Sequence, residues 1–178
     1  TLSEILSDLR LKLGSIDIDV ALTGSAGLGF AETLGLPFVQ EVILSARYIR
    51  MRSPDVRTYL EIGGEDAKLV LLDEMLRPQI RMNGNCAGGT GAFIDQMSML
   101  LNVSLDDMDK LASAGNRIYS IASRCGVFAK TDVQSLLSSH VEKQDIAASI
   151  FHAVAFQDLA SLGKGSEIKS KILFAGGP

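Results

Sequence analysis

The sequence predicts an α/β fold, because amphipathic helical segments alternate along the chain with short apolar runs that are bounded by glycine-rich turns. Hydrophobic residues make up 47% of the 178 residues, which is enough to bury a core in one domain or in two small lobes. Three of the apolar runs are expected to be strands, at residues 16–22, 56–60 and 172–175, and the first and the last of these are expected to be buried. Residues 69–72 are expected to be the return strand of a hairpin.

The chain opens with an expected helix over residues 1–13, in which leucines recur at helical spacing, Ser3 can act as N-cap and Gly14 ends the helix. The first strand then enters a glycine-rich turn at residues 23–29, and a helix is expected from Ala31 onward. A strand, a glycine-rich turn and a helix in this order are typical of anion sites, although glycines in such turns more often serve tight backbone geometry.

Three later segments also have helical periodicity. Residues 39–51 form an amphipathic pattern that should end before Pro54, because the residue before a proline disfavours helix. A short helix is expected after Ser104, with Asp107 at the capping-box position. Residues 145–162 form the longest expected helix, and its apolar side predicts that it belongs to the core.

The turn between the strands at 56–60 and 69–72 reads Gly63-Gly64-Glu65-Asp66. Two glycines let backbone N–H groups approach phosphate oxygens closely, and an acidic residue at the tip can hold Mg²⁺ through water or orient an attacking water. The same residues also favour an ordinary hairpin turn, so the spacing leaves both interpretations open.

The two cysteines of the chain each lie beside an expected helix start. Cys86 lies in a glycine-rich turn within residues 81–91, directly ahead of an amphipathic helix, and Cys125 precedes a helix that Thr131 or Asp132 could cap. Unpaired N–H groups at a helix start stabilise a thiolate, which is the form of cysteine that binds metals.

The net charge of −4, with lysine and arginine dispersed, argues against general nucleic-acid binding. No apolar run approaches the roughly 18 residues that span a bilayer and no signal-peptide pattern opens the chain, so the expected location is the cytoplasm. His140 and His152 have no ligand-spaced partner and are expected to be ordinary surface or core residues. The chain begins with Thr1 and stops directly after an expected strand, so we expect it to be a piece of a longer protein.

Four motifs together resemble one protein family, the activators of 2-hydroxyacyl-CoA dehydratases. This family is also called the CoA-substrate-specific enzyme activases, or the BadF/BadG/BcrA/BcrD ATPase family, and it includes the ATPase components of benzoyl-CoA reductase. The matching motifs are Glu-Ile-Gly-Gly-Glu-Asp at 61–66, Asn-Cys-Ala-Gly-Gly-Thr-Gly at 85–91, Ser-Arg-Cys-Gly-Val-Phe-Ala at 123–129 and Phe-Ala-Gly-Gly at 174–177.

The resemblance implies a ribonuclease H-like fold of the actin and sugar kinase superfamily, in which two lobes clamp ATP. Residues 1–53 would be the C-terminal part of the first lobe, and residues 54–178 most of the second lobe. Residues of the motifs at 61–66 and 174–177, with one residue of the helix after the 85–91 motif, would bind the nucleotide and its Mg²⁺ or act on them. The implied cofactor-binding residues are Gly63, Gly64, Asp95, Gly176 and Gly177, and the implied catalytic residues are Glu65 and Asp66.

The resemblance further implies that Cys86 and Cys125 hold a [4Fe-4S] cluster shared by the two subunits of a homodimer. A cubane cluster generally takes four thiolates, each chain offers two, and a twofold axis supplies the other pair. The same four thiolates would also suit a structural zinc site, so residue chemistry alone leaves the metal open.

The implied function is an ATP-dependent activase that receives an electron from reduced ferredoxin or flavodoxin. It would deliver that electron at low potential to a 2-hydroxyacyl-CoA dehydratase or a benzoyl-CoA reductase-type partner. Two alternatives stay open: a non-catalytic nucleotide-binding module of the same superfamily, and a sugar or acetate-type kinase. Glu65 stands where many relatives carry Gln, and the family's first phosphate motif is not found in these residues, so ATP hydrolysis is not expected from this segment alone.

Overall fold

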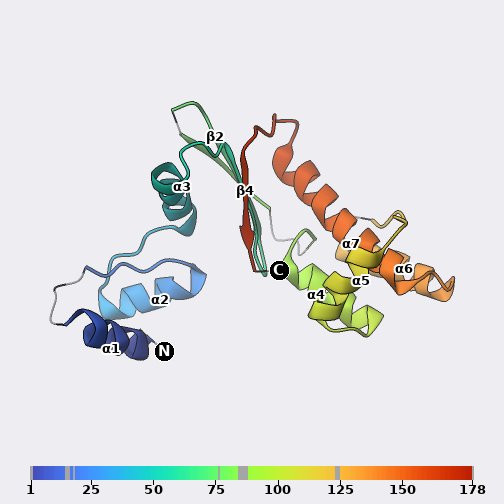
Figure 1. Cartoon of the computed structure of the whole chain (residues 1–178), viewed down its shortest axis with the longest axis horizontal. Coiled ribbons are helices and arrows are strands. Elements are labelled where there is room, and N and C mark those ends of the chain that lie inside the picture. Colours follow the sequence, from blue (N-terminus) through green and yellow to red (C-terminus); the bar gives the residue numbers. More distant parts are fainter. Residues whose placement is uncertain are drawn as a thin grey trace. The chain divides into compact units, whose positions relative to one another are not determined.

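The computed structural model describes residues 2–14, 17, 19–75, 77–83, 88–122 and 125–177. The chain divides into two compact units, Thr1–Tyr48 and Ile49–Pro178, and helix α3 (Glu41–Arg52) crosses the boundary between them (Figure 1). The first unit is helical in its described part, and the second combines a mixed sheet with a layer of helices. The predicted α/β class is therefore confirmed.

Two helices of the first unit follow the prediction closely. Helix α1 (Leu2–Leu13) ends at Gly14, which adopts a left-handed φ of 75° and donates its N–H to Arg10 O at 3.0 Å. The prediction that Ser3 is its N-cap is wrong, because the helix begins at Leu2 and contains Ser3. Helix α3 confirms the helix expected over residues 39–51 and ends at Arg52, ahead of Pro54.

The strand expected over residues 16–22 is wrong for the described part of that segment. Leu22 forms a single parallel bridge with Phe38 and lies in no regular strand, and residues 16 and 18 lie outside the described residues. A strand needs a hydrogen-bonded neighbour along its length, and in the described part of the chain this segment has such a neighbour only at Phe38.

The helix that was expected from Ala31 onward is α2 (Ser25–Leu34), and it begins six residues earlier than expected. Gly24, with a φ of 81°, makes the turn into the helix, so Gly27 and Gly29 belong to the helix itself. The glycine-rich segment at 23–29 is therefore mostly helical, because glycine lowers helix stability without preventing a helix.

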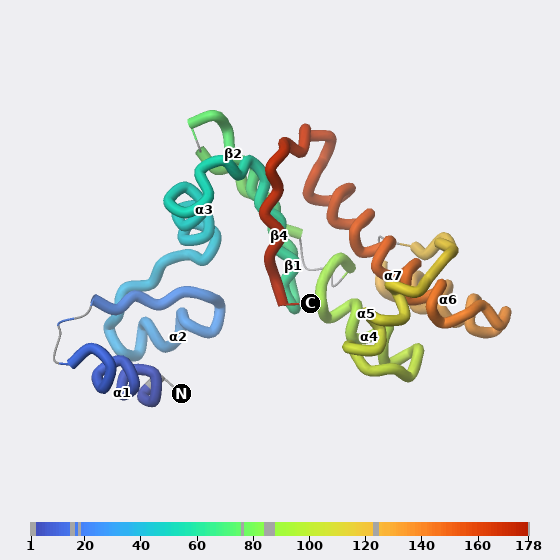
Figure 2. Tube along the Cα trace, viewed as in Figure 1, coloured from blue at the N-terminus to red at the C-terminus, as the bar shows by residue number. Residues whose placement is uncertain are grey.

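The second unit contains a four-stranded sheet in the order β3-β2-β1-β4. The β1–β2 and β2–β3 pairs are antiparallel, and β4 runs parallel to β1 beside it (Figure 2). Strands β1, β2 and β4 confirm the strands that were expected at residues 56–60, 69–72 and 172–175. The strand bounds are β1 Thr58–Ile62, β2 Ala67–Leu72, β3 Pro78–Met82 and β4 Ile172–Gly176.

Two features of the sheet differ from the prediction. Strand β3 was not predicted, and its residues Arg81 and Met82 were assigned to the glycine-rich turn. Its side chains are mostly exposed, so it lacks the apolar alternation that indicates a strand. Strand β4 was expected to be buried, but it is an edge strand on which Ile172 is 57% and Phe174 is 61% exposed.

Four helices form a layer with its own apolar core, which contains Phe93, Met97, Leu101, Met108, Val133, Ile146 and Ile150. The helix expected after Cys86 is confirmed as α4, and Ser104 caps α5 as predicted, since its hydroxyl accepts the Asp107 N–H at 3.1 Å. The bounds are α4 Gly91–Leu101, α5 Leu105–Ala114, α6 Gly126–Ser138 and α7 Lys143–Asp158.

Helix α6 starts earlier than predicted, and Cys125 itself is its N-cap residue. The prediction that Thr131 or Asp132 caps this helix is therefore wrong, because both lie inside it. Their side chains have other partners: Thr131 donates to Val127 O at 3.2 Å, and Asp132 accepts the Ala122 N–H at 2.8 Å. The residues between Cys125 and Thr131 include no helix breaker after Gly126, so the helix extends back to the cysteine.

Helix α7 confirms the long core helix and continues into one π-helical turn, η1 (Leu159–Gly163). By length and composition the segment Lys143–Gly163 could cross a membrane, which the sequence analysis did not expect. Half of its most apolar window is buried inside the protein, where Ile146, Ile150 and Val154 belong to the core of the helical layer. A buried core helix accounts for the same apolar composition.

Candidate functional site

The turn that joins β1 to β2 is tightly closed. The Gly63 N–H donates to Asp66 O at 2.7 Å. A β-carbon at Gly63 would lie 2.8 Å from Asp66 Oδ1 and 3.0 Å from Asp66 O, so the turn requires glycine at this position. At Gly64 no atom lies within 4 Å of the place that a β-carbon would take, so this backbone faces open space.

This turn packs directly on the start of helix α4. The N–H groups of Gly91 and Ala92 donate to the carbonyl oxygens of Gly63 at 2.9 Å and Gly64 at 2.7 Å. The first N–H groups of a helix have no partner within the helix, so the turn carbonyls satisfy them and fix the turn against α4. The hairpin is therefore more than an exposed connection between two strands.

A buried lysine organises the acidic side chains beside the turn. Lys68 is 4% exposed, and its Nζ lies 3.3 Å from Glu61 Oε1 and 3.4 Å from Asp66 Oδ1. The Tyr59 hydroxyl donates to Glu61 Oε2 at 2.7 Å. One ammonium group thus holds two carboxylates, and Asp66 keeps 41% of its side chain exposed beside the turn.

Sequence reasoning missed the roles of Tyr59, Glu61 and Lys68. A lysine inside the otherwise apolar strand β2 was the available signal, because a charge in a buried strand requires a partner. The partner follows from the strand register, which places Glu61 opposite Lys68.

The end of β4 lies beside the end of β1, because Gly176 pairs with Ile62. Gly176 has a φ of 134°, and a β-carbon there would overlap Ile62 O, so only glycine fits. The next residue, Gly177, is thereby placed at the same end of the sheet as the Gly63–Gly64 turn, and its own β-carbon position is open.

Four of the predicted nucleotide residues line one cavity of about 1050 Å³, which lies between the hairpin turn and the helical layer. They are Gly64, Glu65, Asp95 and Gly177, and they come from three segments that are far apart in the sequence. Gly63, Asp66 and Gly176 are sequence neighbours of lining residues but do not themselves line the cavity. The remaining lining residues are Gly91, Ala92, Ile94, Leu105, Asp106, Asp109, Lys110 and Phe151.

The far wall of this cavity was not predicted. Asp106, Asp109 and Lys110 line it from α5, and Phe151 lines it from α7. Asp106 also lies in the first turn of α5, with Asp107, where negative charge is favourable. The Ser104 hydroxyl, and then Lys110, lower the pKa of the adjacent Asp107 below its ordinary value, so this end of α5 stays anionic.

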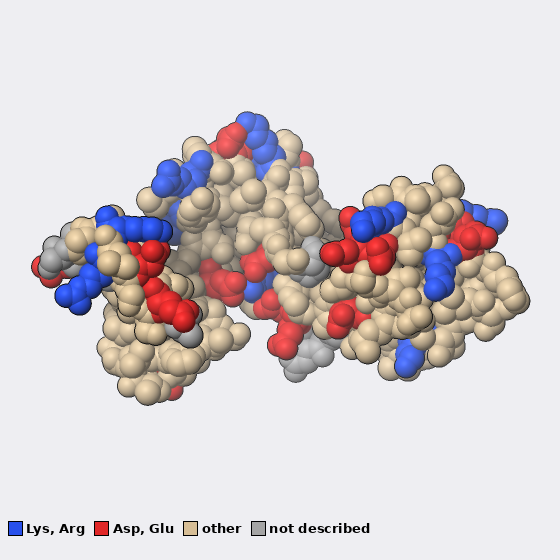
Figure 3. Space-filling model, turned by 60° about the horizontal axis from the view of Figure 1, so that its bottom comes forward, with Lys and Arg blue, Asp and Glu red and all other residues tan. Residues whose placement is uncertain are grey.

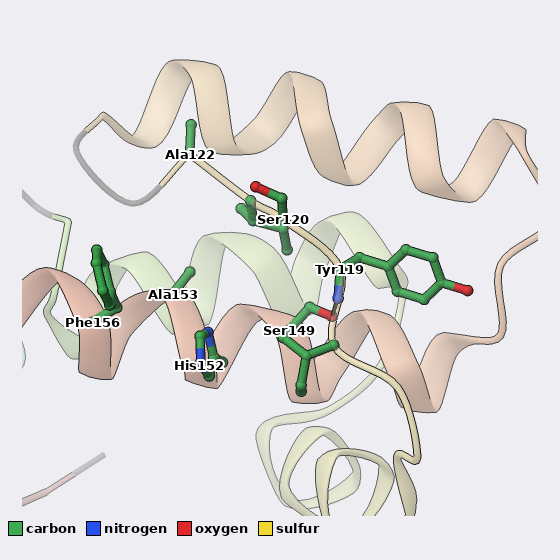
Figure 4. A pocket seen from close by; sticks show the side chains of 9 residues that line it. Tyr119, Ser120, Ala122, Ser149, His152, Ala153 and Phe156 are labelled. Carbon is green, nitrogen blue, oxygen red and sulfur yellow. Dashed lines mark hydrogen bonds between the residues drawn. The ribbon is translucent and has the colours of Figure 1, made fainter.

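A second cavity, of about 550 Å³, lies between residues 118–122 and helix α7 (Figure 4). Ser149 fixes its wall, since its hydroxyl accepts the Tyr119 N–H at 2.8 Å and donates to Asp145 O at 2.6 Å. His152 lines it and is exposed, and His140 is an exposed residue just after α6, as predicted for both. The lining offers mainly apolar and hydroxyl groups and fewer charges than the first cavity.

The two predicted metal ligands differ in what the structure describes. Cys125 is a free, half-buried thiol at the start of α6 and makes no capping hydrogen bond. Cys86 lies outside the described residues. Within the described ranges, no group of three or more histidine, cysteine, aspartate or glutamate side chains could hold a metal ion. The face shown in Figure 3 carries scattered acidic and basic side chains and no single basic patch.

Comparison with known proteins gives one consistent result. The profile of the BadF/BadG/BcrA/BcrD ATPase family matches residues 1–178. The chain is 30% identical over 178 residues to the (R)-2-hydroxyglutaryl-CoA dehydratase activating ATPase of Acidaminococcus fermentans, which covers 99% of this chain and 67% of that protein. It is 32% identical over 179 residues to the 2-hydroxyisocaproyl-CoA dehydratase activator of Clostridioides difficile, which covers 98% and 66%.

The solved structure of the activator of the 2-hydroxyisocaproyl-CoA dehydratase from Clostridium difficile, with bound ADPNP, superimposes with a TM-score of 0.82 at 32% identity. The match covers 98% of this chain and 66% of that structure. This similarity confirms the predicted ribonuclease H-like fold. The chain spans about two thirds of the length of these relatives.

Proposed function

The chain belongs to the BadF/BadG/BcrA/BcrD ATPase family, and from this membership we propose that it is part of an ATP-dependent activase of a 2-hydroxyacyl-CoA dehydratase or a related reductase. The observation that carries the proposal is the convergence of Gly64, Glu65, Asp95 and Gly177 on one cavity. Residues 1–53 would contribute to the first ATP-clamping lobe and residues 54–178 to the second, and the protein would act in the cytoplasm.

The cavity suits a nucleotide in both size and chemistry. Its volume of about 1050 Å³ is ample for ATP, and Gly64 and Gly177 present backbone without side chains, so that phosphates can approach closely. The carboxylates of Asp106 and Asp109 can accept hydrogen bonds from ribose hydroxyls, and Phe151 offers an aromatic surface for the base. The relative with bound ADPNP supports this assignment.

Glu65 and Asp66 are the proposed catalytic residues. Lys68 and the hydrogen bond that closes the turn hold the Asp66 carboxylate in the same turn as Gly64 and Glu65, which line the cavity. From there it would orient a water molecule toward the terminal phosphate. Glu65 is exposed and lines the cavity. A bound Mg²⁺, for which these two carboxylates are suitable oxygen ligands, would neutralise phosphate charge.

Cys86 and Cys125, with the same residues of a second copy, are the proposed ligands of a bridging [4Fe-4S] cluster. The donor chemistry fits, because Cys125 is a free thiol next to the unpaired N–H groups of a helix start, where a thiolate is stabilised. Such a cluster supplies one-electron transfer when it is bound. The residues of this chain would hold it at the dimer axis, and a reduced ferredoxin or flavodoxin would be the electron donor.

The test is anaerobic purification and reconstitution, followed by a visible spectrum and an iron and sulfide count for the native sequence and for the Cys86→Ala and Cys125→Ala variants. We expect about four irons per dimer, lost in either variant while circular dichroism shows that both variants remain folded. Zinc in place of iron would indicate the structural metal site instead. A folded native chain that binds nucleotide but no metal would favour the non-catalytic module and overturn the electron-transfer role.

A further inference from the structure

Asp158, the last residue of α7, is a buried acid for which the proposed function has no use. It is 1% exposed, and neither carboxyl oxygen has a hydrogen-bond partner in the described part of the chain. The hydroxyl of Ser161, one turn later, is also buried without a described partner. Buried polar groups are normally hydrogen-bonded, so a carboxyl group without a donor needs an explanation.

The surroundings of Asp158 are apolar. It lines a small cavity of about 100 Å³ together with Thr58, Leu60, Leu69, Leu159, Leu162, Gly163, Ile168 and Ile172, which come from β1, β2, η1, β4 and the segment before β4. Among the described strand residues, Arg81 of β3, opposite Leu69, is the charged residue on the same face of the sheet. Its guanidinium donates to Leu162 O, Gly163 O and the Ser166 hydroxyl, so it is engaged by the π-helical turn and not by the carboxyl group.

The carboxyl group lies against the turn that leads into α4. A β-carbon at Gly89 would overlap Asp158 Oδ1, and Gly89 has a left-handed φ of 85°. Residues 88–90 are all buried. The residues that follow, Gly91 and Ala92, donate their N–H groups to Gly63 O and Gly64 O. A continuous series of contacts therefore runs from Asp158 through the 88–90 turn to the proposed phosphate-binding hairpin.

The protonation state of Asp158 matters because nothing in the described residues compensates a negative charge there. Burial raises the pKa of Asp158 from 3.8 to about 7. The group is therefore neutral in mildly acidic solution and becomes charged within the physiological range. Once ionised, the carboxylate requires water or a hydrogen-bond donor. Asp158 Oδ1 lies directly against Gly89, so solvation of the carboxylate on that side displaces the 88–90 turn.

We propose that Asp158 is a positioning residue of the nucleotide site. As a neutral acid it packs beneath Gly89 and holds the 88–90 turn in place, and this turn maintains the contact between α4 and the hairpin. As a carboxylate, Asp158 displaces the turn and weakens that contact. Ionisation releases one proton to solvent and involves no other reactant. This inference rests on the proposed function only for its effect on nucleotide binding, because the contacts themselves exist in the free chain.

The first experiment is made without nucleotide, by NMR. The carboxyl carbon of Asp158 is titrated in the native sequence, and amide hydrogen exchange of Gly91 and Ala92 is compared between the native chain and Asp158→Asn at the same pH values. If the packed 88–90 turn requires the protonated form of Asp158, the population of the packed turn falls about tenfold for each pH unit above the titration midpoint. We therefore expect these amides to lose about tenfold more protection between pH 6 and pH 8 in the native chain than in the variant.

Two controls keep the outcome interpretable. Glu167→Gln removes an exposed carboxylate and should reproduce the native exchange profile. Asp158→Leu tests the same point with an apolar side chain if the asparagine variant fails to fold. Titration of Asp158 near 4, or an exchange profile that does not differ between the native chain and the neutral variants, would overturn the proposal.

A second experiment measures the affinity for ADPNP at pH 6 and pH 8. We expect the native chain to lose up to about tenfold more affinity than Asp158→Asn, and the comparison at equal pH cancels the titration of the nucleotide itself. Equal losses would overturn the link to the nucleotide site. A chain that binds no ADPNP at either pH would refute the proposed function, while the NMR experiment would still decide whether Asp158 holds the turn.

Discussion

At the scale of single residues, two glycines near one end of the sheet are constrained in different ways. Gly176→Ala should lower the free energy of unfolding by more than about 2 kcal/mol, because its β-carbon would overlap Ile62 O at a φ that side chains avoid. Gly64→Ala should change it by less than about 1 kcal/mol, since nothing lies within 4 Å. Urea denaturation measures both, and equal costs for the two variants would contradict the described geometry.

Lys68 illustrates how a buried charge depends on its partners. Lys68→Met would leave the mostly buried Glu61 without its cation, and removal of one member of a buried ion pair costs about 3–5 kcal/mol. Lys110→Met is the matched control, because that lysine forms an exposed pair with Asp107 and its loss should leave thermal stability nearly unchanged. Similar melting temperatures for the two variants would argue against the buried network.

Asp158 gives the stability of the protein a distinctive pH dependence. Its pKa is about 7 in the folded chain and 3.8 as a free side chain, so the unfolded chain binds fewer protons between these values. The stabilisation that neutral Asp158 adds to the free energy of unfolding is fully present below pH 4 and is lost as the pH rises to about 7. For a difference of about three pKa units, this loss amounts to about 4 kcal/mol. Denaturation of the native chain and Asp158→Asn from pH 4 to pH 8 should show this difference, and parallel curves would refute it.

At the scale of elements, helix α6 connects the second cavity to Cys125. Asp132, inside α6, accepts the Ala122 N–H, so Asp132→Ala should leave that N–H without its partner. A lost hydrogen bond of about 1 kcal/mol would raise the amide exchange rate of Ala122 by roughly fivefold to tenfold. Thr131→Ala, which removes an exposed hydrogen bond to Val127 O, is the neighbouring control and should not change exchange at Ala122.

The elements that could be predicted from the sequence are those whose pattern is strong over several turns. Helices α1, α3, α4 and α7 show clear helical periodicity, and strands β1 and β2 are apolar runs on either side of a glycine turn. Strand β3 could not be predicted, because its exposed residues contain no apolar alternation. The start of α6 was missed because Cys125, which is not a typical cap residue, takes the N-cap position.

The candidate site was predictable only in part, for a related reason. Glycines and acids in turns are visible as motifs, which is how Gly64, Glu65 and Gly177 were found. Lys68, Phe151 and Asp158 carry no motif, and their importance depends on burial and on neighbours far away in the sequence. Sequence patterns describe the local chain, whereas the partner of a buried charge is set by the register of the sheet and the packing of helices.

At the scale of the whole molecule, the central claim is that the cavity between the hairpin and the helical layer holds a nucleotide. The hairpin turn, α4, α5, α7 and the end of β4 all contribute to it. Each is fixed by a contact described above, including the N–H groups of Gly91 and Ala92 on the turn and Gly176 on Ile62. The site is therefore a property of the assembled unit and not of any one segment.

The measurement that tests this claim most directly is a calorimetric titration of the folded chain with ADPNP and Mg²⁺, for the native sequence and for Gly64→Ala and Gly64→Val. Side chains at this position project into open space, so they should leave the fold intact and obstruct the phosphates. We predict saturable binding to a single site per chain, weakened by Gly64→Ala and weakened at least about tenfold by Gly64→Val. Native affinity in both folded variants, or no binding by the folded native chain, would contradict the account.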